Sequence, residues 1–229
     1  MRIMSYNIHS GKDADNVLDM NGIIEVIRKL APAVCALNEV RMGTTDVKGA
    51  YLAKDAGEAL KMEWRFGRAI DIAGGEYGNA ILSKYPITAS RVVPVPEVPA
   101  ERREKRYEPR CVLECDVAAP MGELRVLTCH FGLSDEEARL ACDTVLALLA
   151  EDARPAVFMG DLNLQPDSPI IARLRTALTD TGDMLPLTFN AKAPTIKIDY
   201  IMSRGLSLGR LQTYATTASD HLPVFADEE

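Results

Sequence analysis

Short apolar runs that end in a polar residue recur along this chain, and this pattern predicts buried β-strands. Most runs are four to eight residues long and are bounded by turn-forming residues, which favours strands over helices. The predicted strands are Met1–Asn7, Val34–Leu37, Gly78–Ser83, Thr88–Val95, Arg110–Val117, Glu123–Cys129, Ala156–Met159, Ile198–Met202, Leu208–Tyr214 and Leu222–Phe225.

Apolar residues at helical spacing predict four helices between these strands. The clearest follows Ser134, a suitable N-cap with Glu137 three residues later, and its apolar stripe continues to Ala150. The other three ranges are Asn21–Leu30, Lys48–Leu60 and Ser168–Leu178.

Turn residues between neighbouring strands predict two β-hairpins. The first would turn at Lys84-Tyr85-Pro86, and the second at Ala119-Pro120-Met121-Gly122. Local hairpins combined with a few covering helices favour an α/β fold of stacked mixed sheets flanked by helices, rather than a doubly wound parallel sheet.

The composition fits one domain covering residues 1–229, with room for a large core. The balance of 26 Lys and Arg against 33 Asp and Glu gives a net charge of −7, so no overall positive field attracts a polyanion. Extended nucleic-acid binding is therefore disfavoured. An acidic chain can also hold a local carboxylate cluster for a metal, because close like charges need a cation between them.

The sequence has no apolar run of the roughly 20 residues that span a bilayer, and its first residues lack the pattern of a signal peptide. Its five cysteines form no CxxC pair and lie mostly in apolar runs, as expected for buried free thiols. These features favour a cytoplasmic protein. They indicate no particular oligomeric state.

The segment Pro94–Pro109 differs from the rest, with four prolines and a charged run from Glu101 to Arg106. We expect a surface loop. Its basic residues are candidates for meeting an anionic substrate, but a charged run in a loop is more often a solvated surface.

Polar and ionisable residues repeatedly stand where a predicted strand ends. In an α/β sandwich the ends of neighbouring strands lie on one rim, so residues distant in sequence can converge there. Their carboxylate and amide oxygens suit a hard cation such as Mg²⁺ or Mn²⁺, and no cysteine-based zinc pattern competes. The residues at strand ends are Asn7, Glu39, His130, Asp161, Asn163 and, before the last strand, Asp220 and His221.

Each of these residues taken singly has a structural explanation, such as a turn cap or a hydrogen-bonded core histidine. Asp199 is different, because it interrupts the apolar run Ile198–Met202. A carboxylate there should not be buried without a partner, so we expect a histidine, a lysine or a metal beside it.

Seven short motifs, in order, resemble the endonuclease/exonuclease/phosphatase superfamily, the deoxyribonuclease-I-like metal-dependent phosphoesterases. Each motif is short, but the ordered set is specific and spans residues 3–225. The motifs are Ser5-Tyr6-Asn7-Ile8-His9, Leu37-Asn38-Glu39-Val40, Gly78-Asn79-Ala80-Ile81-Leu82-Ser83, Thr128-Cys129-His130-Phe131, Gly160-Asp161-Leu162-Asn163, Ile198-Asp199-Tyr200-Ile201 and Ser219-Asp220-His221-Leu222-Pro223-Val224.

The resemblance implies a four-layer α/β/β/α sandwich with the active site at one end of two packed sheets. By position, Glu39 would be the principal Mg²⁺ ligand, with Asn7 and Asp220 lining the same metal site. Mn²⁺ is an alternative ion.

The resemblance also implies catalytic roles. Asp161 would orient and deprotonate the attacking water, and Asn163 would position phosphate and nucleophile. His221, held by Asp199, would contact a phosphate oxygen as an imidazolium. His130 would be either a second phosphate contact or the acid for the leaving group.

Two positions depart from relatives of this family. Asn38 stands where many relatives have glutamine, which shortens an amide next to Glu39 and predicts a tuned rather than an inactive site. Tyr107 stands where several relatives have arginine, so the phosphate contact is assigned to the Tyr107 hydroxyl, to Arg110 or to both.

The leading hypothesis is a metal-dependent phosphodiester or phosphomonoester hydrolase for small or lipid-like substrates. The acidic composition and the lack of basic, aromatic-interleaved stretches favour such substrates over long nucleic acid. A nuclease acting on DNA or RNA is the alternative within the enzymes. An inactive phosphate-binding scaffold would lack catalytic residues, and a purely structural domain would leave Asp199 unexplained.

Overall fold

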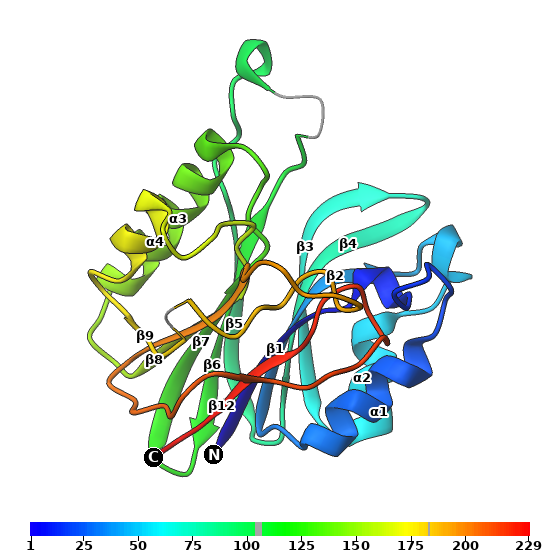
Figure 1. Ribbon diagram of the computed structural model, residues 1–229, viewed down its shortest axis with the longest axis horizontal. Helices are drawn as coiled ribbons and strands as arrows, with labels where there is room; N and C mark the ends of the chain where they lie inside the picture. Colours follow the sequence, from blue (N-terminus) through cyan, green and yellow to red (C-terminus); the bar gives the residue numbers. More distant parts are fainter. Residues whose placement is uncertain (104–106, 183) are drawn as a thin grey trace.

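Two mixed β-sheets pack face to face in the computed structural model, with helices on the outer face of each (Figure 1). The structure describes residues 1–103, 107–182 and 184–229. The first sheet has the order β11-β12-β1-β2-β4-β3 and the second β5-β6-β7-β8-β10-β9. The strands are β1 (Arg2–Asn7), β2 (Val34–Met42), β3 (Glu63–Ile72), β4 (Gly75–Ser83), β5 (Ile87–Pro94), β6 (Cys111–Ala119), β7 (Gly122–Cys129), β8 (Ala156–Asp161), β9 (Thr179–Asp180), β10 (Asp199–Arg204), β11 (Gln212–Thr213) and β12 (Val224–Asp227).

The helices form the two outer layers. Helix α3 begins with the predicted capping box, in which the Ser134 hydroxyl accepts from the Glu137 amide and the Glu137 carboxylate accepts from the Ser134 amide. Helices α1 and α2 cover the first sheet, and α3 and α4 cover the second (Figure 1). Their bounds are α1 (Met20–Leu30), α2 (Leu52–Leu60), α3 (Asp135–Ala150) and α4 (Pro169–Leu174), with 3₁₀ turns at His9–Gly11, Thr45–Val47 and Ala100–Arg102.

Successive side chains of a strand point to opposite faces of the sheet. The apolar residues therefore divide among three interfaces, one between the two sheets and one between each sheet and its helices. In β2, Val34 and Ala36 face the second sheet, whereas Cys35 and Leu37 face helices α1 and α2. Burial on both faces explains why this strand reads as an unbroken apolar run in the sequence.

The layer between the sheets changes from apolar to polar at one end. Following the alternation, the inter-sheet positions continue from Val157 and Met159 to Asp161 in β8, and from Ile201 to Asp199 in β10. The carboxyl end of parallel β1 and β2 meets the same rim, which places Asn7 there too. The chain ends lie close together at the opposite end, where Arg2 pairs with Asp227 (Figure 1).

The structure confirms the predicted fold class and most of the predicted elements, including the β6–β7 hairpin across Pro120 and Met121. The predicted mixture of pairings is also present, because β1–β2 and β7–β8 are parallel and the remaining pairs are antiparallel.

The first predicted hairpin is wrong. The strands on either side of Lys84-Tyr85-Pro86 lie in different sheets, with β4 between β2 and β3, and β5 beside β6. Strand β4 forms its hairpin with β3, which the sequence did not predict because β3 is an edge strand with exposed charged residues such as Glu63 and Arg68.

Several predicted bounds are also corrected. The helix predicted from Lys48 begins only at Leu52, because Lys48 adopts the left-handed conformation that ends a 3₁₀ turn. The helix predicted to Leu178 ends at Leu174, and the strand predicted over Leu208–Tyr214 is reduced to two residues of β11. Conversely, β2 continues beyond Leu37 to Met42.

The described parts of the segment Pro94–Pro109, residues 94–103 and 107–109, project from the second sheet beside the start of α3 (Figure 1). Residues 104–106 of the charged run lie outside the described residues. In the described part, Arg102 pairs with Glu136 at 2.8 Å and Arg103 pairs with Glu97. These two arginines therefore already have acidic partners, which supports the solvated-surface interpretation of this stretch.

Among the described residues, no helix is long and apolar enough to cross a membrane.

All five cysteines are buried free thiols, as predicted. Burial raises the pKa of every thiol, including Cys111 to about 12 and Cys142 to about 11. We therefore expect no rapid reaction of the folded protein with Ellman's reagent at pH 8, and release of five equivalents in denaturant. Fast labelling of any thiol in the folded protein would contradict the packing around it.

Candidate active site

Asp161 lies at the centre of the polar rim and is almost completely buried. Its Oδ2 accepts from Asn7 Nδ2 at 3.0 Å, and the Nε2 atoms of two histidines lie 3.5 Å (His130) and 3.6 Å (His221) from it. Burial raises the pKa of Asp161 to about 7, although the neighbouring His221 and the hydrogen bonds from Asn163 and Asn7 oppose the rise. A carboxylate with this pKa is suited to accept a proton near neutral pH.

Gly160 allows β8 to pack close to β7, and this close packing places Asp161 at the rim. It has φ of +154°, and a Cβ at this residue would lie 2.0 Å from the carbonyl oxygen of Cys129 in β7. Only glycine permits the two strands to approach so closely.

Glu39 occupies a bulge in β2, between the pairs Leu37↔Ala80 and Val40↔Gly78. Its backbone is left-handed, with φ of 59°, a conformation that costs about 1–3 kcal/mol and recurs at functional sites. The extra residue turns the Glu39 carboxylate toward the rim, where its Oε1 accepts from Asn7 Nδ2 at 3.0 Å.

The side chain of Asn38 forms hydrogen bonds that link the two sheets beneath the site. Its Oδ1 accepts from the Asp161 backbone N–H at 2.9 Å, and its Nδ2 donates to Asn79 Oδ1 at 2.8 Å and to Thr128 Oγ1 at 3.4 Å. The amide next to Glu39 therefore holds the backbone of Asp161.

We expect Asn38→Ala to lower the free energy of unfolding by about 1–3 kcal/mol, because the buried Asp161 N–H loses its acceptor. Urea unfolding measures this change. The control, Asn21→Ala on the exposed face of α1, should stay within about 0.5 kcal/mol of the parent. Equal effects of the two substitutions would contradict the cross-linking role.

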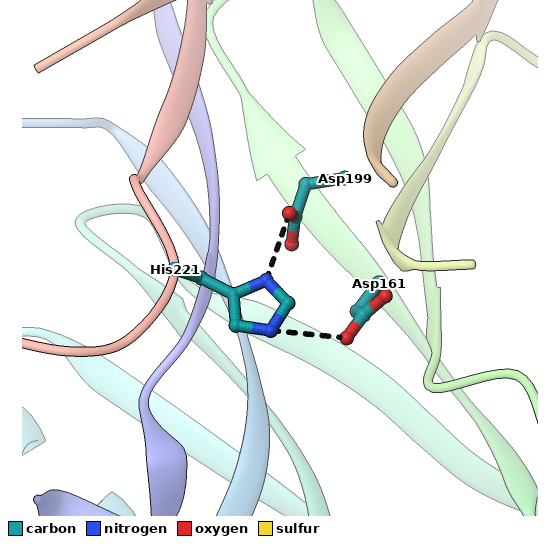
Figure 2. A group of neighbouring side chains, drawn as sticks. All are labelled: Asp161, Asp199 and His221. Carbon is teal, nitrogen blue, oxygen red and sulfur yellow. Dashed lines mark hydrogen bonds and ion pairs between the residues drawn. The ribbon is translucent and has the colours of Figure 1, made fainter. Parts of the chain in front are cut away.

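His221 is paired with the buried Asp199, which supplies the partner that burial of this carboxylate requires. Figure 2 shows the His221 ring between Asp199 and Asp161. The Nδ1 atom of His221 lies 2.9 Å from Asp199 Oδ2. Burial lowers the pKa of His221, but the two carboxylates outweigh it and raise the pKa to about 10. The two carboxylates therefore favour the imidazolium form of His221 at neutral pH.

The same three side chains, Asp161, Asp199 and His221, are also close enough together to be considered as metal ligands. Both ring nitrogens of His221 already face carboxylates, and its raised pKa keeps both protonated. A metal ion needs a deprotonated imidazole nitrogen. The cluster therefore fits a charge-paired imidazolium better than a metal site.

Carboxylate oxygens also lie beside the amide of Asn7. Glu39 Oε1 and Asp161 Oδ2 both lie 3.0 Å from Asn7 Nδ2, so two carboxylates converge on one amide. In the described part of the chain, neither Glu39 nor Asp220 pairs with a lysine or an arginine. Glu39 and Asp220 thus offer oxygen donors of the kind that a hard divalent ion prefers.

Asp220 lies at the rim, in the loop before β12. Its neighbour there is His9, which was not among the site residues predicted from the sequence. Asp220 Oδ1 lies 3.7 Å from Nδ1 of His9, whose left-handed backbone and position two residues after Asn7 bring the ring there. The backbone N–H of His9 also donates to Asn7 Oδ1 at 3.0 Å.

His130 and Asn163 complete the group around Asp161. The Asn163 N–H donates to Asp161 Oδ1, and its side chain donates to the Phe131 carbonyl, both at 3.0 Å. His130 Nδ1 lies 3.2 Å from Nη1 of Arg110. Of the two predicted phosphate contacts, Arg110 thus lies against His130, whereas the Tyr107 ring packs under the Arg103 guanidinium at 4.3 Å.

An aromatic neighbour was also missed. The Phe189 ring lies 4.8 Å from the His221 ring, and the two backbones form an isolated bridge. The sequence offered no indication, since Phe189 stands in an irregular segment between predicted elements.

Known proteins resemble this chain in sequence and in fold. A sequence model described as the Endonuclease/Exonuclease/phosphatase family matches residues 4–221. The chain is 25% identical over 253 residues to "Uncharacterized protein YbhP" of Escherichia coli (strain K12), covering 99% of this chain and 95% of that protein.

Two solved structures share the fold over the whole chain. A functionally unknown conserved protein from Enterococcus faecalis superposes with a TM-score of 0.82 at 18% identity, covering 100% of this chain and 99% of that one. The mannosyl-6-phosphatase Bt3783 of Bacteroides thetaiotaomicron gives a TM-score of 0.79 at 19% identity, with the same coverage.

Proposed function

We propose that this chain, which belongs to the endonuclease/exonuclease/phosphatase family, hydrolyses a phosphoester bond of a small or lipid-like substrate with the help of a divalent cation. Members of this family are metal-dependent hydrolases of phosphoesters. The observation that carries the proposal is the position of Asp161, a buried carboxylate between Asn7 and two imidazoles at the rim of both sheets.

Asp161 is the proposed general base. Its pKa of about 7 allows it to take a proton from an attacking water at neutral pH, and the Asn163 N–H holds the other carboxylate oxygen in place. Asn163 itself, whose side-chain amide donates to the Phe131 carbonyl, is the residue proposed to orient the phosphate and the nucleophile.

His221 is the proposed charge-stabilising group. Phosphoester hydrolysis builds negative charge on non-bridging oxygens, and a preorganised cation in a buried site stabilises that charge. Asp199 keeps the imidazolium protonated and fixes its orientation.

Glu39, Asn7 and Asp220 would hold the cation, and Mg²⁺ or Mn²⁺ fits these oxygen donors. When bound, the ion would supply Lewis-acid stabilisation of the phosphoryl oxygens. Asn7 also connects the metal side to the base, because its amide donates to both Glu39 and Asp161.

The charge of the protein supports a small or lipid-like substrate. The net charge of −7 disfavours following a nucleic-acid backbone, and Arg102 and Arg103, in the described part of the charged run, already pair with carboxylates. One structural neighbour is a mannosyl-6-phosphatase, which is in keeping with a phosphomonoester. A nuclease remains the second candidate, tested by adding single- and double-stranded DNA and RNA to the same assays.

The test is hydrolysis of bis-p-nitrophenyl phosphate and p-nitrophenyl phosphate with Mg²⁺, with Mn²⁺ and with EDTA. We expect metal-dependent turnover, and a fall of about 10²-fold or more in Glu39→Gln, because the bound cation contributes several kcal/mol. Glu58→Gln on the exposed surface of α2 is the matched control and should behave like the parent.

Calorimetric titration with Mn²⁺ provides a readout independent of turnover. Glu39→Gln should bind the ion more weakly than Glu58→Gln. Turnover that persists in EDTA, or equal metal affinity in the two variants, would overturn the assignment of Glu39.

A further inference from the structure

The two buried histidines of the site, His130 and His221, have the same neighbour at Nε2 but neighbours of opposite charge at Nδ1. Both direct Nε2 toward Oδ2 of Asp161, at 3.5 Å from His130 and 3.6 Å from His221. Behind them, however, Nδ1 of His221 meets the Asp199 carboxylate, whereas Nδ1 of His130 meets the Arg110 guanidinium at 3.2 Å. A carboxylate only accepts hydrogen bonds, and a guanidinium only donates them.

This difference determines where the proton of His130 lies. Because Arg110 donates, Nδ1 of His130 has to accept and carries no proton. The proton then sits on Nε2, where it faces the Asp161 carboxylate. The other tautomer would oppose two N–H groups at Arg110, and a guanidinium cannot accept, so Arg110 selects the Nε2–H form.

Arg110 is held firmly in this position. Its side chain is only 10% exposed and pairs with Glu108 at 2.7 Å, and its backbone carbonyl accepts from Val95 at 2.9 Å. Burial lowers the pKa of Arg110, but the nearby Glu108 and Tyr77 outweigh it, so the guanidinium stays charged.

We propose that Arg110 is a positioning residue that holds His130 as the neutral Nε2–H tautomer, so that His130 donates a hydrogen bond to a phosphate oxygen and does not protonate the leaving group. This inference rests on the proposed function for its catalytic meaning. Of the two roles that the sequence left open for His130, it selects the phosphate contact.

Electrostatics agrees with the geometry. Burial, the Arg110 charge and the His221 charge together lower the pKa of His130 well below its usual value. The site would then contain one imidazolium, His221, and one neutral donor, His130. A second imidazolium so close to Arg110 and His221 would be strongly disfavoured.

The tautomer can be measured without substrate or metal, by long-range ¹H–¹⁵N correlation spectra of the histidine rings. The protein has three histidines, so the His9→Gln and His221→Gln variants complete the assignment. We expect an unprotonated Nδ1 and a protonated Nε2 for His130 between pH 6 and 8. A protonated Nδ1, or an imidazolium in this range, would overturn the proposal, whatever the enzyme hydrolyses.

Arg110→Met and Arg110→Lys separate positioning from packing. Met removes the donor, whereas Lys retains a charged donor, so we expect a changed His130 tautomer ratio in the former and recovery toward the parent in the latter. In the phosphatase assay, kcat should fall about 10–100-fold in Arg110→Met, with partial recovery in Arg110→Lys. An unchanged ¹⁵N spectrum in Arg110→Met would refute the positioning role even if activity fell.

His130 substitutions test the donor role directly. Glutamine places an N–H near the position of Nε2 but cannot act as an acid, so His130→Gln should retain at least about tenfold more activity than His130→Ala. Equal loss in both would contradict a neutral donor. If the parent hydrolyses neither reagent, the proposed function fails, while the spectra still decide the tautomer.

Discussion

Replacing Asp161 by asparagine is expected to lower kcat by about 10²–10⁴-fold, the contribution typical of a positioned general base. The amide can still accept from the Asn163 N–H but cannot take a proton from water. Initial rates with the preferred p-nitrophenyl reagent at saturating metal measure this loss. The control is Asp167→Asn, an exposed aspartate on the loop that follows, which should leave kcat unchanged.

The same substitution should change the pH dependence of stability. Burial raises the pKa of Asp161 to about 7, so ionising it costs folding free energy; the cost is absent below pH 4 and fully present above about pH 7. A neutral asparagine removes that cost, although its Nδ2 then faces Asn7 Nδ2 and the two histidine Nε2 atoms in place of the Asp161 Oδ2 acceptor. The urea midpoint of metal-free Asp161→Asn should therefore rise relative to that of the parent as the pH increases from 4 to 8. A difference between the two midpoints that stays constant over this range would contradict the raised pKa.

The pattern of apolar runs was enough to predict most of the buried strands, because strands buried on both faces differ plainly from turns, but it missed the exposed edge strand β3. It did not predict their partners. The turn at Lys84-Tyr85-Pro86 looks like a hairpin, but it carries the chain from β4 in one sheet to β5 in the other. Pairing is decided by the packing of whole layers, which a local pattern does not contain.

The candidate site was predictable where its residues continue a strand pattern. Asp199 interrupts an apolar run, and its burial alone required a partner, which the structure supplies as His221. The catalytic and metal-binding roles of these residues stay predictions until they are measured. The sequence could not show the bulge that turns Glu39 toward Asn7, because a bulge depends on the register with β4.

The contact between Arg110 and His130 was beyond the sequence for a similar reason. Arg110 precedes β6 and His130 follows β7, and the antiparallel pairing of those strands brings the two ends together. Sequence position suggested a phosphate contact for Arg110, whereas the structure places its guanidinium behind an imidazole. What a charged residue does in a site depends on which atom it faces.

Asp199→Asn is expected to lower kcat by about 10²–10³-fold at neutral pH, the scale of losing one preorganised charge-stabilising contact. In the parent, Asp199 and Asp161 hold the pKa of His221 at about 10 against the opposing effect of burial. Asparagine can still accept from Nδ1, but it cannot balance a positive charge. The pKa of His221 should therefore fall.

The direction of the pH dependence follows from that fall. Because the proposed active form is the imidazolium, lowering its pKa moves the loss of activity to lower pH, so the variant should lose activity as pH rises through neutrality. Ring ¹⁵N shifts of metal-free protein measure the His221 pKa directly, and kcat against pH measures its consequence. Asp227→Asn, at the far end of the molecule, is the control. If His221 titrated alike in the parent and in Asp199→Asn, the carboxylate would be orienting the ring rather than sustaining its charge, and the two readouts together distinguish these roles.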